Sequence, residues 1–320
     1  MPVDSEPDIV VERGSEVRRH PRVSVIVPAW FRNPQPGGAW LDEALESVRA
    51  QTFRDWELII VDDGSPAPVT PSRTDDLVLV RQPNAGPGGA RNSAVRLAQG
   101  EFLAFLDADD RWLPDKLARQ VAFLDANPDV VLTCTDILLT DGTPMKTARE
   151  KRVAVGDRIP FEFLFHENCV GCSTVVMRRA TFEMTRGMDA HRRMGEDFAL
   201  WLRVGLLGAI GYLEAPLMVR RRHADSLMSD QMHDGSWWQR EREVYDEFLA
   251  EAPHLRSEPF VARAQARLAF QRAWMRLAER RWAEARKLFL ASARHDPLRW
   301  RTWVNLARAI LHIGPRRQST

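Results

Sequence analysis

Four short, mostly apolar segments, each ended by proline or by polar residues, constrain the fold more than any other feature of this chain. Each is long enough for one buried strand, and each is rich in the residues that favour strands. They are Val23–Val27, Trp56–Val61, Leu77–Val80 and Phe102–Leu106. Similar patterns predict two later strands, at Val130–Cys134 and Ser173–Met177.

Helical segments separate these strands. Apolar residues recur at i, i+3, i+4 and i+7 in Trp40–Gln51, and the glycine-rich segment Asn84–Asn92 leads into a helix that ends near Ala98. Two further helices are expected at Asp115–Leu124 and Phe198–Leu207. Strands that alternate with helices at this spacing favour an α/β fold with a mostly parallel sheet and helices on both of its faces.

Polar side chains gather where three of the strands end. Pro28 and Trp30 follow the first strand, Asp62 and Asp63 the second, and Asp107, Asp109 and Asp110 the fourth. Ligands bind outside the carboxyl ends of the strands in sheets of this kind. We therefore expect these side chains to converge on one edge of the sheet.

The acidic cluster Asp107–Asp110 suits a divalent cation, because Mg²⁺ and Mn²⁺ prefer oxygen ligands and commonly join carboxylates to phosphate oxygens. An Asp-x-Asp pattern alone is common in turns. Its position directly after a strand, with a second acidic pair ending another strand of the same sheet, favours a cation site over a plain turn.

Five motifs resemble those of family 2 glycosyltransferases, which have the GT-A fold. They are V-S-V-I-V-P-A-W (23–30), W-E-L-I-I-V-D-D-G-S (56–65), N-x-G-x-x-x-A-R-N (84–92), G-E-F-L-A-F-L-D-A-D-D-x-W-x-P-x-K-L (100–117) and G-E-D-F-x-L-W-L-R (195–203). The resemblance covers residues 21–225. It implies transfer of a sugar, with inversion and with Mn²⁺ or Mg²⁺, from a nucleotide diphosphate sugar, preferably a UDP-sugar, to a saccharide or lipid-linked acceptor.

The resemblance also implies roles for individual residues. It assigns the donor nucleotide to Pro28, Trp30, Asp62, Asp63, Arg91, Asp107 and His223, and the metal to Asp107, Asp109, Asp110 and His223. Trp30-Phe31 replaces the Tyr-Asn that is more usual at this place in the family. Asp197 is the expected general base, and Glu196 is the alternative.

The remainder of the chain differs in composition. From residue 256 onward there are 15 Lys and Arg against 4 Asp and Glu, although the whole chain carries a net charge of only +1. We expect a flexible leader (1–20), the catalytic domain (21–225), a linker or helix (226–255) and a helical, tetratricopeptide-like extension (256–320). The four tryptophans of the extension either form its core or lie on a membrane: Trp274, Trp282, Trp300 and Trp303.

Composition excludes several classes of protein. The chain has 44% apolar and 28% charged residues, which excludes a disordered chain, and three cysteines are too few for a disulfide framework. The absence of a long apolar segment or an apolar signal core indicates a cytoplasmic protein, with peripheral contact at the inner face of the membrane as an option. No nucleic-acid partner is expected. A non-catalytic nucleotide-sugar-binding scaffold and a nucleotidyltransferase are the alternative functions.

Overall fold

The computed structural model describes residues 9–140, 156–223 and 237–314. The chain forms two compact units, the first made of Met1–Leu164 and Cys169–Ala224, the second of Phe165–Asn168 and Asp225–Thr320. Parts of all four segments defined from the sequence lie outside the described residues. These are residues 1–8 of the leader, residues 141–155 and 224–225 of the catalytic domain, residues 226–236 of the linker and residues 315–320 of the extension.

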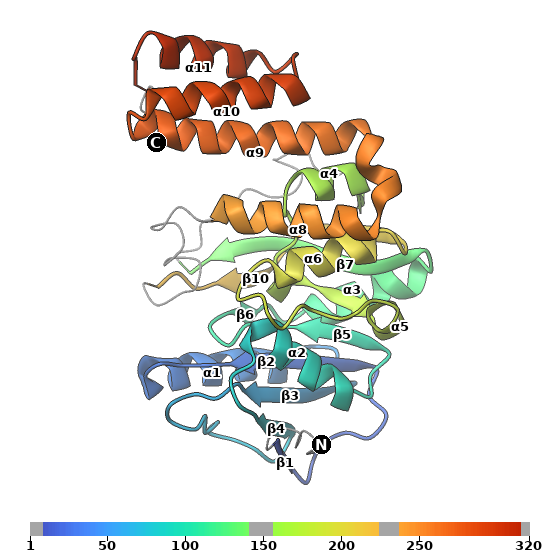
Figure 1. The fold of residues 1–320 in the computed structure, drawn as a ribbon. Coiled ribbons are helices and arrows are strands. Elements are labelled where there is room, and N and C mark those ends of the chain that lie inside the picture. Colours follow the sequence, from blue (N-terminus) through green and yellow to red (C-terminus); the bar gives the residue numbers. More distant parts are fainter. Residues whose placement is uncertain (1–8, 141–155, 224–236, 315–320) are drawn as a thin grey trace, which may run out of the picture. The chain divides into compact units, whose positions relative to one another are not determined.

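One mixed sheet of ten strands forms the centre of the first unit (Figure 1). Its strands are β1 (Val10–Arg13), β2 (Val23–Ala29), β3 (Trp56–Asp62), β4 (Leu77–Arg81), β5 (Phe102–Phe105), β6 (Arg111–Trp112), β7 (Val130–Leu139), β8 (Arg158–Ile159), β9 (Val176–Arg178) and β10 (Ala209–Arg220). The order across the sheet is β1-β4-β3-β2-β5-β9-β7-β10-β6, and β8 pairs with β10 outside this path.

Strands β4, β3, β2 and β5 run parallel to one another, as do β7 and β10. The short strand β9 is antiparallel to both β5 and β7 and so joins the two parallel groups. The mostly parallel α/β sheet that the sequence predicts is therefore confirmed. Because β2 lies between β3 and β5, the carboxyl ends of these three strands are neighbours on one edge.

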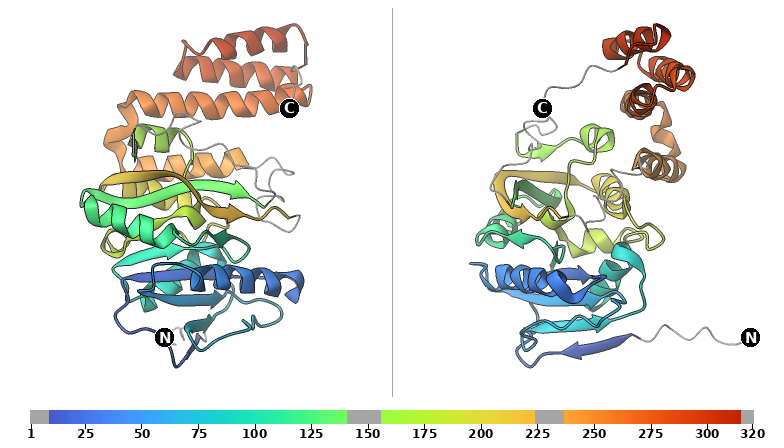
Figure 2. Two further views of the ribbon diagram at one scale, coloured as in Figure 1. Left: turned by 180° about the vertical axis from the view of Figure 1, so that it is seen from behind. Right: turned by 90° about the vertical axis from the view of Figure 1, so that its left-hand side faces the viewer.

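Helices cover both faces of the sheet (Figure 2). The helices of this unit are α1 (Pro34–Arg49), α2 (Gly86–Leu97), α3 (Lys116–Ala126), α5 (Arg179–Glu183) and α6 (Glu196–Gly205), and α4 (Phe161–His166) runs from the first unit into the second. Apolar residues of α1 and α3 share one core with β2 and β3. On the other face α2 contacts β2 and β3, and Trp201 of α6 contacts the Phe105 ring of β5.

Two local expectations differ from the structure. Val10–Arg13 belongs to the predicted leader, yet it forms β1, whose backbone bonds to the otherwise open edge of β4. A strand was also predicted from Ser173 to Met177, but Cys172–Thr174 forms a 3-10 turn and β9 begins only at Val176. In that turn the Thr174 hydroxyl and amide both donate to the Gly171 carbonyl, at 2.6 and 2.9 Å, which competes with strand pairing.

The second unit is helical in its described part. Its helices are α8 (Trp237–Glu251), the 3-10 turn η2 (Pro253–Ser257), α9 (Pro259–Ala278), α10 (Trp282–His295) and α11 (Trp300–Ile310). Helix α10 packs against both α9 and α11 (Figure 1), around Ala273, Leu277, Ala285, Phe289, Leu306 and Ala309. The likeness to tetratricopeptide repeats stays a prediction. None of the described helices is long and apolar enough to cross a bilayer.

Candidate active site

Trp30 directly follows β2 and leaves 44% of its surface exposed at the strand edge. An exposed indole ring has a flat apolar face on which another aromatic ring can stack. The ring therefore offers a stacking surface beside the ends of β3 and β5, and its contact with a nucleotide base stays a prediction.

Asp62 and Asp63, at the end of β3, are both buried and have different partners. The Asp62 carboxylate accepts hydrogen bonds from the amides of Ser65 and Val69, at 3.1 and 3.0 Å, and from Arg81 at 3.2 Å. It therefore shapes the loop after β3. A base contact by Asp62 stays a prediction, but its oxygens already serve this loop.

The Asp63 carboxylate instead connects β3 to the start of α2. Its Oδ1 accepts hydrogen bonds from the Gln82 amide at 2.7 Å and from the backbone N–H of Ala85 at 2.8 Å. Burial raises the pKa of Asp63 above its ordinary value, and these hydrogen bonds oppose that shift. Asp63 thus positions the glycine-rich segment that begins the helix.

The acidic cluster after β5 forms a tight turn in which the Asp110 amide donates to the Asp107 carbonyl at 3.0 Å. The Asp107 side chain is 34% exposed and that of Asp109 is 29% exposed. Asp110 is buried, and burial together with the charges of Asp107 and Asp109 raises its pKa to about 8. Its Oδ1 accepts a hydrogen bond from the Arg221 backbone at 3.1 Å.

The segment that follows β10 returns to this cluster. His223 Nε2 lies 2.9 Å from Asp109 Oδ2, and the imidazole contacts the Trp40 ring with centroids 4.3 Å apart. Arg221 secures the segment, because its Nε donates to the Asp109 carbonyl at 3.2 Å and its Nη2 to Glu43 at 2.6 Å. Within the described chain, the buried His223 Nδ1 has no hydrogen-bond partner.

The Asp109 carboxylate is a donor of the type that Mg²⁺ and Mn²⁺ prefer. Its Oδ2 lies at hydrogen-bond distance, 2.9 Å, from His223 Nε2. Among the described residues, no group of three or more His, Cys, Asp or Glu side chains is arranged to hold a metal. Mg²⁺ is commonly bound by one or two carboxylates together with substrate phosphates and water, and Asp109 can provide one such carboxylate. Ligation by Asp107, Asp109, Asp110 and His223 stays a prediction.

Arg91 joins the acidic cluster to the first turn of α6. Its Nη2 donates to Asp107 Oδ1 at 2.6 Å and its Nη1 to Glu196 Oε1 at 2.9 Å. The Arg91 side chain is only 5% exposed. Removing such a cation leaves a buried carboxylate uncompensated, which is costly. The nucleotide contact expected of Arg91 stays a prediction; in the structure it positions Asp107 and Glu196.

Glu196 and Asp197 begin α6, directly after Gly195, whose φ of 78° is a left-handed conformation that favours glycine. Burial, and next the charge of Asp197, raises the pKa of Glu196 to about 7. Burial also raises the pKa of Asp197, while Arg91 opposes the shift. A carboxylate whose pKa lies closer to neutrality is suited to general base catalysis.

Asn92 is a positioning residue to which the sequence analysis gave no role. Its side-chain amide donates to the Met188 carbonyl at 2.6 Å, and its Oδ1 accepts from the Met188 amide at 3.0 Å. These two bonds fix the segment that precedes α6 to α2. The signal was present in the sequence, because Asn92 ends the motif A-R-N, but periodicity alone gives no information on a contact with residue 188.

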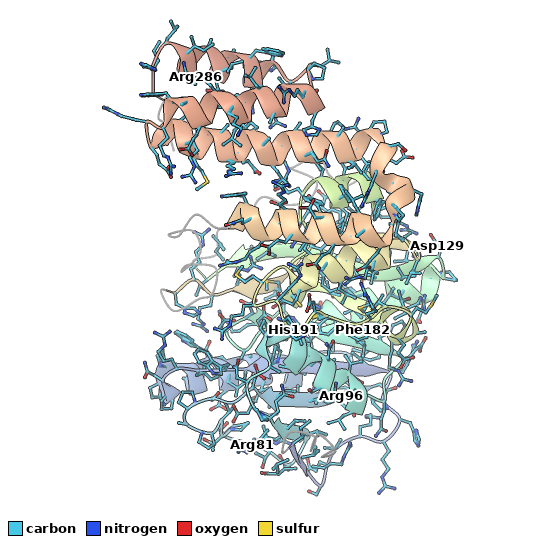
Figure 3. All side chains as sticks on the ribbon, in the orientation of Figure 1. Arg81, Arg96, Asp129, Phe182, His191 and Arg286 are labelled. Carbon is cyan, nitrogen blue, oxygen red and sulfur yellow. The ribbon has the colours of Figure 1, made fainter. Side chains whose placement is uncertain are left out.

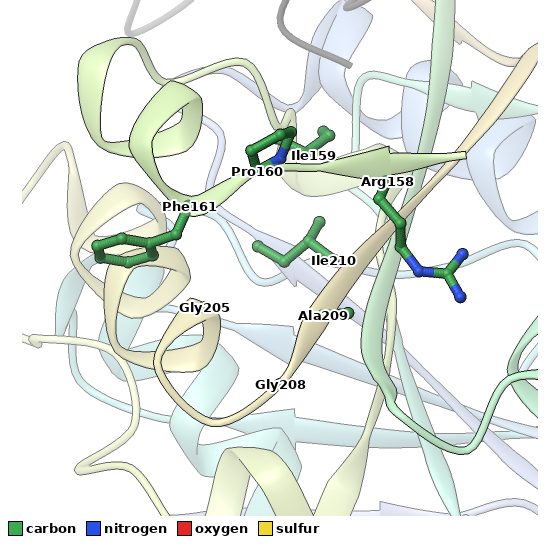
Figure 4. A pocket seen from close by; sticks show the side chains of 8 residues that line it. All are labelled: Arg158, Ile159, Pro160, Phe161, Gly205, Gly208, Ala209 and Ile210. Carbon is green, nitrogen blue, oxygen red and sulfur yellow. The ribbon is translucent and has the colours of Figure 1, made fainter. Parts of the chain in front are cut away.

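A separate pocket of about 330 Å³ lies at the other end of α6 (Figure 4). Its lining residues are Arg158, Ile159, Pro160, Phe161, Gly205, Gly208, Ala209 and Ile210. None of the candidate site residues lines it. Figure 3 shows the side chains of the whole described chain, including His191 in the segment before α6.

The fold, a mixed sheet covered by helices on both faces, is of the GT-A type. The sequence model of "Glycosyl transferase family 2" matches residues 24–185. The chain therefore belongs to glycosyl transferase family 2. Transfer of a sugar from a nucleotide sugar is its activity, as the motifs predicted.

Named relatives and solved structures agree with this assignment. The putative teichuronic acid biosynthesis glycosyltransferase TuaG of Bacillus subtilis is 29% identical over 60% of this chain and 75% of its own. The UDP-Glc:alpha-D-GlcNAc-diphosphoundecaprenol beta-1,3-glucosyltransferase WfgD of Escherichia coli is 28% identical over 57% of this chain and 69% of its own. Longer relatives exist, and the match spans 34% of an uncharacterized glycosyltransferase of Rickettsia felis.

Two solved structures resemble the fold. The S. aureus TarS 1-349 structure has a TM-score of 0.62 at 19% identity, over 91% of this chain and 87% of that one. The mannosyltransferase PcManGT from Pyrobaculum calidifontis, in complex with GDP-Man and Mn²⁺, has a TM-score of 0.55 at 19% identity, over 97% of this chain and 89% of that one. At these identities the likeness establishes the fold alone.

Proposed function

We propose that this enzyme transfers a sugar from a UDP-sugar to a saccharide or lipid-linked acceptor, with inversion and with the help of Mn²⁺ or Mg²⁺. The observation that carries the proposal is the Arg91 bridge, which brings the Asp107–Asp110 cluster and the Glu196–Asp197 pair to one site. WfgD uses UDP-Glc and a diphosphoundecaprenol acceptor, and TuaG is named for teichuronic acid biosynthesis. These names support a role in cell-envelope polysaccharide synthesis at the cytoplasmic side of the membrane.

The donor site lies at the ends of β2, β3 and β5. The exposed ring of Trp30 stacks on the base, and the backbone at Pro28 and the carboxylate of Asp63 set the edge of the base pocket. Loss of such stacking costs about 1 kcal/mol beyond the buried area, so Trp30→Ala weakens UDP binding by at least about fivefold. Isothermal titration with UDP measures this change.

A cation at Asp109 and His223 suits the leaving group. When bound, Mn²⁺ or Mg²⁺ neutralises the charge that gathers on the departing diphosphate. Asp109 and His223 provide one carboxylate and one imidazole donor 2.9 Å apart. Asp107, directed by Arg91, faces the sugar-nucleotide side of the same turn as a further donor, and buried Asp110 maintains the turn through its bond to the Arg221 backbone.

Asp197 is the group proposed to take the proton from the acceptor hydroxyl. That oxygen attacks the anomeric carbon as the bond to the diphosphate breaks, and a single displacement inverts the anomeric centre. Asp197 is held at the start of α6, where its Oδ1 accepts the Phe198 amide at 2.6 Å. Glu196 carries the ion pair to Arg91, so it positions this turn and is the second candidate for the base.

The experiment compares sugar transfer, and hydrolysis of the donor by water, in the native enzyme and in Asp197→Asn with Mn²⁺ present. A panel of nucleotide sugars screened by thermal shift identifies the donor, since a ligand that binds the native state raises the melting temperature. Loss of the base lowers turnover about 10²- to 10⁴-fold while donor affinity is kept. Asp129→Asn, a change of an exposed carboxylate on another surface, is the matched control.

Three results would contradict the proposal. Full turnover in Asp197→Asn would remove Asp197 from the chemistry. Donor binding without any transfer or hydrolysis, with every acceptor class tried, would favour the nucleotide-sugar-binding scaffold instead. Retention of the anomeric configuration in the product, determined by NMR, would exclude the single displacement.

A further inference from the structure

Helix α11 has one face that packs on the described part of the second unit and an apolar face on its other side. Thr302, Asn305, Leu306 and Ala309 are buried, and the last two share the core with Phe289 of α10. Because successive residues turn about 100° around a helix, Trp300, Val304, Ala307 and Leu311 lie on the opposite side, at spacings of i, i+4, i+7 and i+11. We call these four residues the outer face of α11.

The outer face is exposed to a degree that is unusual for such residues. Trp300 is 66% exposed, Val304 42% and Leu311 67%. Trp303 and Ile310 extend the face on one flank, at 47% and 54% exposure. An apolar helical surface of this extent is unfavourable in water. The outer face of α11 is therefore expected to meet something other than water.

The four tryptophans of this region separate into two pairs. Trp274 and Trp282 pack against the core of α9, α10 and α11, as a structural role predicts. Trp300 and Trp303 do not. The Trp303 indole N–H donates to the Pro297 carbonyl at 2.7 Å, so its polar atom is satisfied within the chain while nearly half of the side chain stays exposed.

Basic side chains border the outer face. Arg301 and Arg308 both lie about 90° from its centre, on the flank opposite Trp303 and Ile310. The Arg301 guanidinium is 5.7 Å from the centre of the Trp300 ring. Residues 282–314 contain six Lys and Arg and only two Asp and Glu. A helix with tryptophan and aliphatic residues on one face and arginine beside it is suited to the surface of an anionic bilayer.

We propose that the outer face of α11 docks on the anionic surface of a lipid membrane, with Trp300, Val304 and Leu311 entering the headgroup region and Arg301 and Arg308 contacting lipid phosphates. A second copy of the chain is the competing occupant. Antiparallel pairing of two outer faces places the arginine flanks of both copies side by side, with like charges opposed, whereas an anionic membrane complements them. The proposal does not rest on the chemistry of the active site.

Vesicle co-sedimentation of the full chain tests the docking. One vesicle type is phosphatidylcholine alone and the other contains roughly 40% phosphatidylglycerol. Binding is expected on the anionic vesicles and to fall with salt, because the membrane attraction of Arg is screened. Arg301→Glu with Arg308→Glu lowers the partition coefficient at least about 30-fold, since the loss of each charge accounts for roughly fivefold. Trp300→Ser with Leu311→Ser lowers it at least about tenfold.

The control is Arg96→Glu with Arg242→Glu, which gives the same change of net charge at exposed arginines of α2 and α8 (Arg96 is labelled in Figure 3). This control keeps vesicle binding within about twofold if the outer face is the contact. All variants keep native circular dichroism and native hydrolysis of the nucleotide sugar in solution, so a failure of docking is separate from a failure of the proposed chemistry.

Three outcomes would overturn the docking. The first is absence of binding to anionic vesicles, and the second is equal binding by the native chain and both outer-face variants. The third is a dimer in analytical ultracentrifugation that Trp300→Ser with Leu311→Ser converts to a monomer, because that result assigns the face to a second copy.

Discussion

Arg91→Met gives the sharpest test of the way the site is built. Methionine fills similar volume in the core but removes a guanidinium that is 5% exposed and bonded to Asp107 and Glu196. Asp107 is 34% exposed and water can replace its lost partner, whereas Glu196 is 8% exposed and has no such access. The loss in free energy of unfolding that Arg91→Met causes therefore depends on whether the Glu196 carboxyl is charged.

The sign of the pH dependence follows from the pKa of Glu196. That pKa is about 7 in the native protein, above the ordinary 4.5, and loss of the Arg91 charge raises it further. At pH 6 the carboxyl is protonated in the folded variant and the cost is about 1 kcal/mol, that of the lost hydrogen bonds. At pH 8 folding of the variant must either bury an unpaired carboxylate or keep it protonated, and the cost rises to about 3 kcal/mol.

Thermal unfolding at the two pH values measures this difference. For a unit of this size, 1 kcal/mol shifts the melting temperature by about 2–4 °C, so the deficit is roughly 2–4 °C at pH 6 and 6–12 °C at pH 8. Glu196→Gln with Arg91→Met removes the unpaired charge and restores much of the loss at pH 8. An equal deficit at both pH values, or none at pH 8, would refute the reasoning.

Three further predictions concern single groups. His223→Gln weakens Mn²⁺ binding in the presence of UDP by about tenfold, as measured by electron paramagnetic resonance, while leaving the fold intact. The value of kcat/KM rises between about pH 5 and 8, because Asp197 must be ionised to act as the base and the pKa values of the Glu196–Asp197 pair are raised. A flat pH profile would contradict the role of Asp197 as general base. Lys116→Met stabilises the fold by about 1–3 kcal/mol at pH 6 and by less at pH 9. Burial lowers the pKa of Lys116, so as the pH falls the unfolded chain binds a proton that the folded chain does not, and the native protein loses stability. Chemical denaturation at both pH values checks this.

The positions of the central strands along the chain were predictable from the sequence, because each apolar run is ended by proline or by polar residues. Apolar runs such as Trp56–Val61 predicted both the strand and the edge at which Asp62 and Asp63 appear. Strand β9 was harder to predict. Its three residues carry no alternation of their own, and their antiparallel pairing to β5 and β7 depends on tertiary contacts.

The candidate site followed the same pattern. The motifs located the acidic groups. They did not show that Asp62 holds the loop after β3 while Asp63 holds the start of α2, because these roles depend on which backbone amides each carboxylate reaches. Likewise, the motif predicted that Arg91 contacts the nucleotide. Its burial between Asp107 and Glu196 could be seen only in the folded chain. Spacing in a sequence carries no information about distances of this kind, because the partners are far apart along the chain.

The two anchors on α2 have a consequence for the start of α6. Asn92 bonds to Met188, and its neighbour Arg91 bonds to Glu196, so consecutive residues of one helix hold both ends of the intervening segment. The segment also packs closely on α2, because a side chain on Gly88 would meet the Asp189 carbonyl at 2.8 Å. Any displacement of α2 would therefore move Met188 and Glu196 together.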